Sequence, residues 1–401
     1  MILSRFSSRL CSGTRIKKLL GWGLNLWLAL ASRSQAETAT APAIWTNQTH
    51  FPLCVWLQHP TNALSFRLAG FNTYVGLWKG PTEAQLQSLR DAEMFVICSQ
   101  NSAALGRKDD TNIIAWLQED EPDNARNRGA RFGFGSPTSP EKIVERYRSM
   151  KTADPTRPVF LNLGQGVAWD NWHGRGNRNG HPEDYPKYLQ GCDIASFDIY
   201  PMNHFSKEVS GNLWFVARGV ERLSNWTENK KPVWNAIECT RINDTGRKPT
   251  PREVRCEAWM SLIHGSRGLI YFVHQFKPEF REAALLDDKE MLDAVTVLNQ
   301  QIIRLAPVIN SPTIKNSLAV ESGTPSVPVA AMMKNFSGTN YIFAVAMRND
   351  STHATFKLAG LTGSNRVEVL DEDRSLEMQD GAFRDTFQPW QVHLYRIHAA
   401  Q

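Results

Sequence analysis

Eight short apolar runs alternate with amphipathic segments between residues 51 and 276, and this alternation leaves few folds open to the chain. The runs are almost continuously apolar, as parallel strands are when both of their faces are buried. They span residues 51–57, 71–78, 94–100, 113–122, 159–166, 192–201, 232–240 and 269–276. Segments with apolar residues at helical spacing separate them, among them 81–93, 139–154, 213–226 and 251–266.

This pattern predicts an α/β fold, a (β/α)8 TIM barrel, over residues 49–309. The last helical segment of the barrel, 287–309, ends shortly before Pro312. A doubly wound open sheet is the alternative. The Gly-rich phosphate loop that often follows the first strand of such a sheet is missing here, so the barrel is favoured.

The pattern changes beyond the barrel, because apolar residues then recur at every second position. Runs at 327–335, 339–350, 353–361, 365–373 and 390–398 are separated by Gly, Asn, Asp and Ser. Alternation of this kind is typical of antiparallel strands with one buried face. Residues 310–401 are therefore predicted to form a small C-terminal antiparallel β-sandwich with an accessory, structural role.

The first 36 residues have the composition of a secretory signal peptide. Basic residues precede an apolar stretch from Leu19 to Ala31, and Ser34 and Ala36 are placed as in a cleavage site. An uncleaved anchor is the alternative, although the stretch is short for a membrane span. We expect a secreted or periplasmic protein with a linker at 37–48 and no membrane contact after cleavage.

Charge and cysteine content exclude several classes of protein. The formal net charge of +5 becomes −1 once the six basic residues of the signal peptide are removed, so the composition predicts no binding of nucleic acid. The five cysteines beyond the signal, an odd number, are expected to be small buried hydrophobic residues. There is no CxxC or HExxH spacing, and we predict neither a metal site nor a cofactor.

Acidic residues close two of the predicted strands. Glu121 ends the fourth apolar run, within "WLQEDEP", and Glu238 is the only acid in the seventh, "PVWNAIECT". Catalytic groups of TIM barrels collect at the carboxyl ends of the strands, and these two strands face each other across the mouth. Two facing carboxylates are what hydrolysis of a glycosidic bond requires.

These segments resemble the clan A glycoside hydrolases, which are (β/α)8 retaining enzymes with catalytic Glu residues on strands four and seven. "WLQEDEP" is similar to the W-x-x-x-N-E-P segment of the clan, "KPVWNAIE" to its nucleophile strand, and "SFDIYP" to its sixth-strand segment. The resemblance covers residues 50 to 309 and identifies no particular family. It implies that Glu121 is the acid/base, that Glu238 is the nucleophile and that Tyr200 hydrogen-bonds Glu238.

One residue departs from the clan pattern. Asp120 stands where the clan has an Asn whose amide contacts the sugar 2-hydroxyl. An ionised Asp accepts hydrogen bonds but cannot donate them, so the contact to the 2-substituent is expected to differ. The departure bears on the identity of the sugar, and the type of reaction is unaffected.

Other residues near the predicted strand ends have the chemistry to hold a sugar. Polar groups bond hydroxyls, and Trp stacks on a pyranose ring. The predicted substrate-binding residues are Trp78, Asp120, Asn162, Trp169, Trp172, Asp198, Tyr200 and His274. Asp123 is expected to be a solvated residue that caps a helix.

The predicted function is a secreted retaining glycoside hydrolase that cleaves β-glycosidic bonds in an oligo- or polysaccharide by double displacement. The main alternative is a non-catalytic carbohydrate-binding barrel, in which at least one of the two acids would often be lost. A weaker alternative is a metal-dependent hydrolase that uses Glu119, Asp120 and Asp123. The predicted partner is a carbohydrate, and the sequence predicts no oligomeric state.

Overall fold

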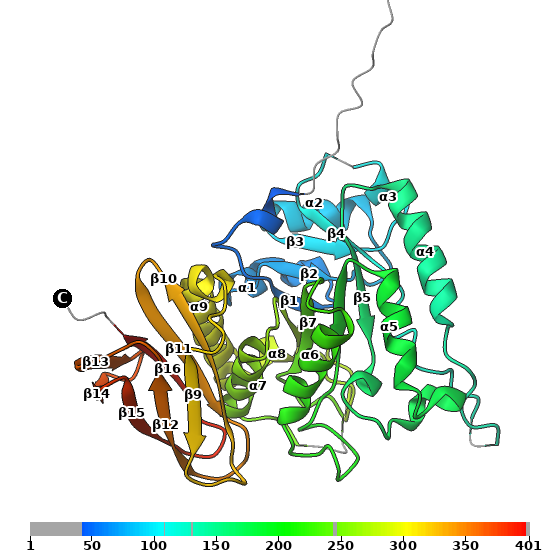
Figure 1. Cartoon of the computed structure of the whole chain (residues 1–401). Coiled ribbons are helices and arrows are strands. Elements are labelled where there is room, and N and C mark those ends of the chain that lie inside the picture. The colour runs from blue at the N-terminus through cyan, green and yellow to red at the C-terminus, as the bar shows by residue number, and fades with distance from the viewer. Residues whose placement is uncertain (1–41, 108, 130, 244–246, 398–401) are drawn as a thin grey trace, which may run out of the picture. The chain divides into compact units, whose positions relative to one another are not determined.

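The computed structural model describes residues 42–107, 109–129, 131–243 and 247–397 (Figure 1). The predicted signal peptide, residues 1–36, and the first part of the predicted linker lie outside the described residues. Across the described residues, no helix is both long and apolar enough to cross a membrane.

Eight parallel strands close into a barrel in sequence order, as predicted (Figure 1). The first strand pairs with the last through Leu53 and Leu269, which closes the ring. The strands are β1 (Leu53–Trp56), β2 (Thr73–Val75), β3 (Phe95–Cys98), β4 (Ile113–Leu117), β5 (Val159–Leu163), β6 (Ile194–Phe197), β7 (Val233–Glu238) and β8 (Leu269–Phe272). Each lies within one of the eight apolar runs.

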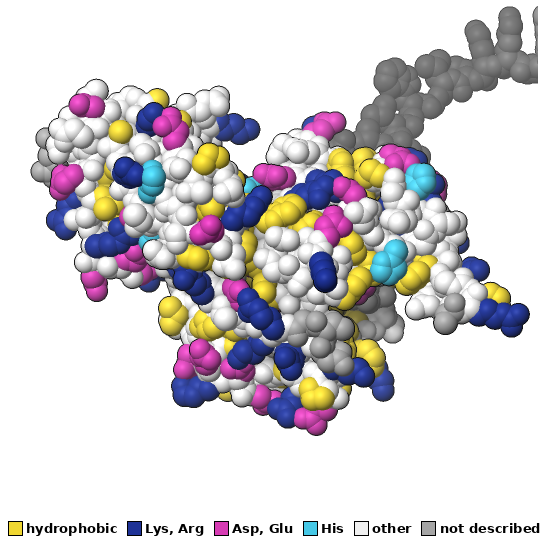
Figure 2. Space-filling view, turned by 90° about the horizontal axis from the view of Figure 1, so that it is seen from below, with side chains coloured by type: hydrophobic (Ala, Val, Ile, Leu, Met, Phe, Trp, Pro, Cys, Tyr) yellow, Lys and Arg dark blue, Asp and Glu magenta, His cyan; other side chains and the backbone are white. Residues whose placement is uncertain are grey.

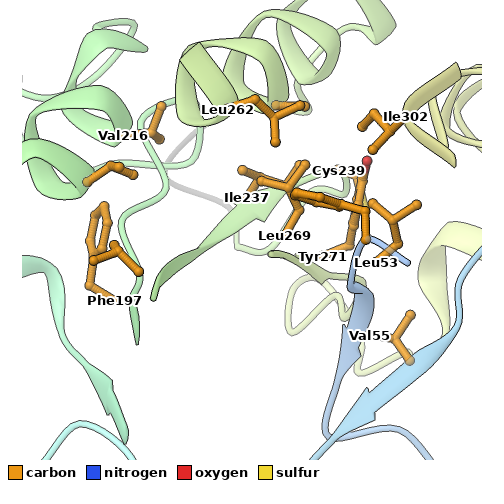
Figure 3. Packing of buried hydrophobic residues seen from close by; sticks show 14 of the residues in the cluster. Leu53, Val55, Phe197, Val216, Ile237, Cys239, Leu262, Leu269, Tyr271 and Ile302 are labelled. Carbon is orange, nitrogen blue, oxygen red and sulfur yellow. The ribbon is translucent and has the colours of Figure 1, made fainter. Parts of the chain in front are cut away.

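Two apolar layers explain why the runs are apolar at almost every position. Cys54, Ile114 and Trp234 belong to a cluster inside the barrel. Their strand neighbours, such as Leu53 and Val55, belong to a larger cluster between the strands and the surrounding helices (Figure 3). Successive side chains of a strand point to opposite faces, so a strand buried on both faces needs apolar residues at odd and even positions.

The predicted helical segments form α2 (Glu83–Asp91), α4 (Pro140–Ala153), α6 (Trp214–Trp226), α7 (Pro251–Ile263) and α9 (Lys289–Asn310). Capping boxes start α2 at Thr82 and α7 at Thr250. Shorter helices that we did not predict are α1 (Ala63–Leu68), α3 (Ser102–Leu105), α5 (Tyr185–Tyr188) and α8 (Ala284–Asp287). Four to six residues are too few to show a helical period in a sequence.

The described part of the predicted linker contacts the amino-terminal end of the barrel. A 3-10 helix, η1 (Ala43–Thr46), carries Trp45, whose indole Nε1 donates to the Ile114 carbonyl at 3.0 Å. The Trp45 ring also lies 6.1 Å from the ring of Trp234 inside the barrel, measured between centroids. This segment therefore closes the end of the barrel opposite the predicted active site.

The C-terminal strands form one eight-stranded sheet in the order β10, β11, β16, β13, β14, β15, β12, β9. They are β9 (Leu318–Ser322), β10 (Val329–Phe336), β11 (Thr339–Ala346), β12 (Thr352–Leu358), β13 (Ser364–Val369), β14 (Arg374–Gln379), β15 (Ala382–Phe387) and β16 (Val392–Ile397). All pairs are antiparallel, and β9 contacts β10 at the other end of the order, so the unit is sandwich-like, as predicted. Phe343 of β11 packs on Trp259 of α7, with ring centroids 5.0 Å apart.

Charged residues of both signs are interspersed on the face shown in Figure 2, with hydrophobic side chains between them. Such a mixed surface agrees with the small net charge of the chain without its first 36 residues.

Candidate active site

The segment that follows β4 places Glu121 at the carboxyl end of the barrel. Glu121 has a φ of 42°, a left-handed conformation that is unfavourable for a residue with a side chain. Two backbone hydrogen bonds hold this turn, from Glu121 N to Asn162 O at 2.9 Å and from Asn124 N to Glu121 O at 3.0 Å. The turn therefore fixes the direction of the Glu121 side chain, which is half-buried.

Asn162 on β5 connects the acids that follow β4 and β6. Its side-chain Nδ2 donates to Asp120 Oδ1 at 3.0 Å and to Asp198 Oδ2 at 3.1 Å. Asp198 is in turn held by its own backbone N, which donates to Leu163 O at 3.0 Å. The side chains of Asp198 and Asn124 lie close enough to Glu121 to lower its pKa. Asp120, Glu121 and Asp198 thus form one cluster, which we call the acid cluster.

The acid cluster retains protons at neutral pH. Burial, followed by the negative charges of Asp120 and Asp123, raises the pKa of Glu121 to about 7. Burial, followed by the charges of Glu121 and Asp120, raises the pKa of Asp198 well above its ordinary value. Burial also raises the pKa of Asp120 to about 6, although solvent reaches its side chain at the strand end. A carboxyl with a pKa near 7 is suited to general acid catalysis.

Glu238 lies at the end of β7, as predicted, but its side chain is 0% exposed. One of its carboxylate oxygens accepts a hydrogen bond from the backbone N of Met202. The other accepts from the backbone N of Asn203 at 2.9 Å and from the Asn203 side chain. An oxygen that attacks a sugar must be accessible to it, and in this conformation the Glu238 side chain is not; its role as nucleophile stays a prediction.

A second acid accompanies Glu238. Glu257 of α7 is also 0% exposed, and no donor among the described residues reaches either of its carboxyl oxygens. Burial raises the pKa of Glu238 to about 7, and burial with the charge of Glu238 raises the pKa of Glu257 well above its ordinary value. A buried carboxyl without a donor is favoured in its protonated form.

Tyr200 does not make the contact that the resemblance implied. Among the described residues, its hydroxyl forms no hydrogen bond with Glu238. Tyr200 is half-buried and packs on Phe272, with ring centroids 5.1 Å apart. Its pKa is raised by burial and then by the charges of Asp198, Glu121 and Asp120, so it lies beside the acid cluster.

The predicted tryptophans differ in exposure. Trp78 follows β2 and is 57% exposed. Trp169 is buried, and its indole donates to Glu208 at 2.7 Å, which joins the loop after β5 to the loop after β6. Trp172 is partly exposed and donates to Asn124 Oδ1 at 2.6 Å, next to Glu121.

His274, which follows β8, is buried, and its Nε2 lies 3.1 Å from Gln58 Nε2. Burial lowers its pKa, so the imidazole is neutral at neutral pH. Of the eight predicted binding residues, the structure brings Asp120, Asn162, Asp198 and Tyr200 to the acid cluster, with Trp172 at its edge.

Two neighbouring acids have structural contacts. Glu119 pairs with Arg146 and accepts from Thr138, which directs it away from the acid cluster. Asp123 is 0% exposed, accepts from Gly164 N at 2.8 Å and Tyr185 Oη at 3.0 Å, and thereby joins the loops after β4 and β5. The expectation that Asp123 is solvated was wrong.

The side chains of Glu119 and Asp123 do not converge with Asp120 into a metal site, and no metal-binding group of three is present in the described part of the chain.

Several contacts of the site were not predicted. Asn124 contacts Glu121, Asn203 holds Glu238, and Glu257 pairs with Glu238. For Glu257 a signal existed, because it is an acid among the apolar residues of "CEAWM". Asn203 was recognisable as a polar residue after the sixth strand, but its contact with Glu238 left no signal, since Glu238 lies 35 residues away along the chain.

Exposed aromatic side chains lie in the loops around this end of the barrel. Trp78, Phe132, Phe205, Phe276 and Phe280 are the exposed aromatic residues of the described chain, and each follows the carboxyl end of a barrel strand. Phe205 stacks on His204, with ring centroids 4.6 Å apart, and contacts Trp169 and Trp172. Exposed aromatic faces are suited to stacking on sugar rings.

No protein-family model and no curated protein matches the sequence. Solved structures do match the fold. One is an α-amylase from Geobacillus thermoleovorans complexed with acarbose, 10% identical, with a TM-score of 0.53 over 88% of this chain and 99% of that chain. Another, described as a glycoside hydrolase, is 11% identical, with a TM-score of 0.53 over 88% of this chain and 93% of that one. At these identities the comparisons show that the chain has the same fold as these two proteins.

Proposed function

We propose that this protein is a secreted retaining glycoside hydrolase that cleaves β-glycosidic bonds in an oligo- or polysaccharide. The observation that carries the proposal is Glu121, a half-buried acid with a pKa of about 7 that a strained turn holds at the carboxyl end of the barrel. Such an acid donates its proton to a leaving glycosidic oxygen at neutral pH. One fold can host many different reactions, so the functional assignment rests on the residues of the site.

The surrounding residues support a carbohydrate substrate. The acid cluster offers hydrogen-bond acceptors for hydroxyl groups, Asn162 and Asn124 offer amides, and exposed aromatic residues occupy the neighbouring loops. Retention of configuration and the β-linkage rest on the clan A resemblance of "WLQEDEP" and "SFDIYP". Secretion rests on the composition of residues 1–36.

A non-catalytic carbohydrate-binding barrel is the second candidate, and one observation favours it. Glu238, the residue that the resemblance makes the nucleophile, is sealed by Met202, Asn203 and Glu257. If no other carboxylate replaced it, the barrel would bind sugars without hydrolysing them.

The test is a screen of residues 37–401 against aryl β-glycosides and common β-linked polysaccharides. Glu121→Gln should lower kcat by about two to four orders of magnitude on polysaccharides, where leaving groups need a proton. Glu119→Gln is the matched control, since Glu119 is a neighbouring acid that pairs with Arg146, and it should keep near-normal turnover. NMR of the first product should show the β-anomer. Saturable binding without turnover would instead establish the non-catalytic candidate.

A further inference from the structure

We propose that this protein cleaves internal bonds of a β-linked polysaccharide, and that two groups of aromatic side chains bind sugar units on both sides of the acid cluster. The inference rests on the proposed glycosidase function and adds the class of substrate to it. The substrate is a chain that extends beyond the broken bond in both directions.

The first aromatic group lies in the long loops after β4, β5 and β6. Phe205 is exposed, and its ring stacks on His204 with centroids 4.6 Å apart. The ring of Trp172, which is partly exposed, lies 6.1 Å from that of Phe205. The other members are Phe134, Trp169 and His173. Exposed apolar side chains that form a contiguous patch mark a binding surface, whereas isolated ones need no explanation.

Hydrogen bonds connect the first aromatic group to Glu121. Trp172 Nε1 donates to Asn124 Oδ1 at 2.6 Å, and the backbone N of Asn124 donates to Glu121 O at 3.0 Å. His204 Nε2 lies 2.7 Å from Gln165 Oε1, a contact that joins the loop after β6 to the loop after β5. The rings therefore have a fixed position relative to the proposed acid.

The second aromatic group comes from the end of β8 and the loop that follows it. Tyr200, on the segment after β6, packs on Phe272 with ring centroids 5.1 Å apart. The ring of Phe276 lies 5.9 Å from that of Phe272, and the ring of Phe280 lies 5.8 Å from that of Phe276. Phe276 and Phe280 are both exposed. The buried His274 is stacked on Phe276, with an angle of 6° between the ring planes.

The two groups approach the acid cluster from different sides of the barrel mouth. In the closed ring, β5 and β8 are three strands apart, and Trp172 follows β5 whereas Phe272 ends β8. Tyr200 stands two residues after Asp198, so the second group begins beside the acid cluster. A sugar chain that stacks on both groups therefore passes Glu121 with units on either side of the bond that breaks.

The chemistry of the two groups fits a chain of β-linked sugars. The faces of a pyranose ring carry C–H groups, and they stack on aromatic rings. A β-linked chain is extended, so successive sugar rings can lie along one line of aromatic side chains. An enzyme that removes single units from a chain end needs binding surface mainly on one side of the broken bond. Exposed rings on two sides are therefore the arrangement expected for cleavage within a chain.

The first experiment follows viscosity and reducing ends together while residues 37–401 act on hydroxyethylcellulose, soluble xylan and galactomannan. On the polysaccharide that is cleaved, the viscosity should fall steeply while few reducing ends have formed, and the early products should be oligosaccharides of mixed length. Release of mono- or disaccharides alone, or hydrolysis confined to aryl β-glycosides, overturns the inference and leaves the glycosidase function intact. If the folded protein cleaves no β-glycoside at all, the proposed function is wrong and the inference falls with it.

Matched variants test each aromatic group separately. Phe205→Ala and Phe276→Ala should each raise KM on the cleaved polysaccharide by about threefold to tenfold with little change in kcat, because stacking outside the reacting bond contributes to binding. The rise should be smaller on an aryl β-glycoside, which is too short to reach both groups. Ile303→Ala is the control, since Ile303 is exposed on α9 and lies beside Gly70, which precedes β2 at the amino-terminal end of the barrel. A rise in KM for only one of the two Phe variants would show that the chain binds on one side alone, and would overturn the inference.

Discussion

The side-chain amide of Asn162 donates to Asp120 at 3.0 Å and to Asp198 at 3.1 Å, and so holds together two acids from different strand ends. Both bonds favour the ionised form of their acceptor and oppose the effect of burial on its pKa. The amide therefore keeps negative charge in a part of the site where burial would otherwise neutralise it.

Replacing this amide should impair catalysis more than folding. We expect Asn162→Ala to reduce kcat/KM on the order of a hundredfold, because the acids are no longer held in register. The acid limb of the pH–rate profile should move to higher pH, since the pKa values of Asp120 and Asp198 rise without their donor. Gln100→Ala, at the end of another strand, should leave the profile unchanged. An unshifted acid limb in Asn162→Ala would show that the amide does not tune these acids.

The rate should fall as pH rises through neutrality. Glu121 must be protonated to donate, and its pKa is raised from 4.5 to about 7 by burial and by the neighbouring acids. The active fraction is thus full well below pH 7 and declines above it, which a pH profile of kcat on a substrate with a poor leaving group will reveal. A basic limb above pH 9 would contradict this assignment.

Stability should also decline with rising pH. Glu238 has a folded-state pKa raised from 4.5 to about 7, so its contribution to stability is fully present below about pH 4.5 and is lost as pH rises through about 7. Urea unfolding at pH 5.5 and pH 8 should therefore give a lower free energy of unfolding at the higher pH. Glu257→Gln should weaken this dependence, because Glu257, whose pKa burial also raises, no longer titrates. An equal pH dependence in both proteins would show that the pair does not contribute.

Trp78 should contribute to binding by stacking. It is 57% exposed just after β2, and its loss should raise KM by about threefold to tenfold with little change in kcat. Leu68→Ala is the control, because Leu68 is 72% exposed on α1 and is placed outside the strand-end loops. Initial rates on a soluble oligosaccharide will separate the two. Equal KM values for Trp78→Ala and the unchanged protein would remove Trp78 from the binding site.

The C-terminal sheet should stabilise the barrel through packing contacts. Phe343 is buried against Trp259, so Phe343→Ala should lower the free energy of unfolding by about 3–5 kcal/mol. Activity per folded molecule should stay the same, since the contact lies outside the acid cluster. Val297→Ala, at an exposed position of α9, should cost less than about 0.5 kcal/mol. A large fall in kcat of folded Phe343→Ala would assign the sheet a catalytic role.

The residue pattern determined the architecture because it depends on local periodicity. Strands buried on both faces need apolar residues at successive positions, as "IIAWL" and "VFLNL" have, and this indicated parallel strands. The number of such runs and the missing Gly-rich loop then favoured a barrel over a doubly wound sheet. The short strand β9 has alternating half-buried and exposed residues and little apolar content, and its pattern was too weak to predict. The placement of Glu121 at a strand end likewise followed from the apolar run before it and Pro122 after it.

Tertiary structure decided which acids are accessible. Glu121 and Glu238 look alike in the sequence, since each ends an apolar strand. The difference between them comes from partners remote along the chain: Glu238 is covered by residues 202 and 203 and by Glu257, and Glu121 meets Asn162 and Asp198. Asp123 was misjudged for the same reason, because Gly164 and Tyr185 cover it. Periodicity reports which face of a strand is buried, whereas the exposure and hydrogen bonds of a side chain at the strand end depend on loops that only folding brings together.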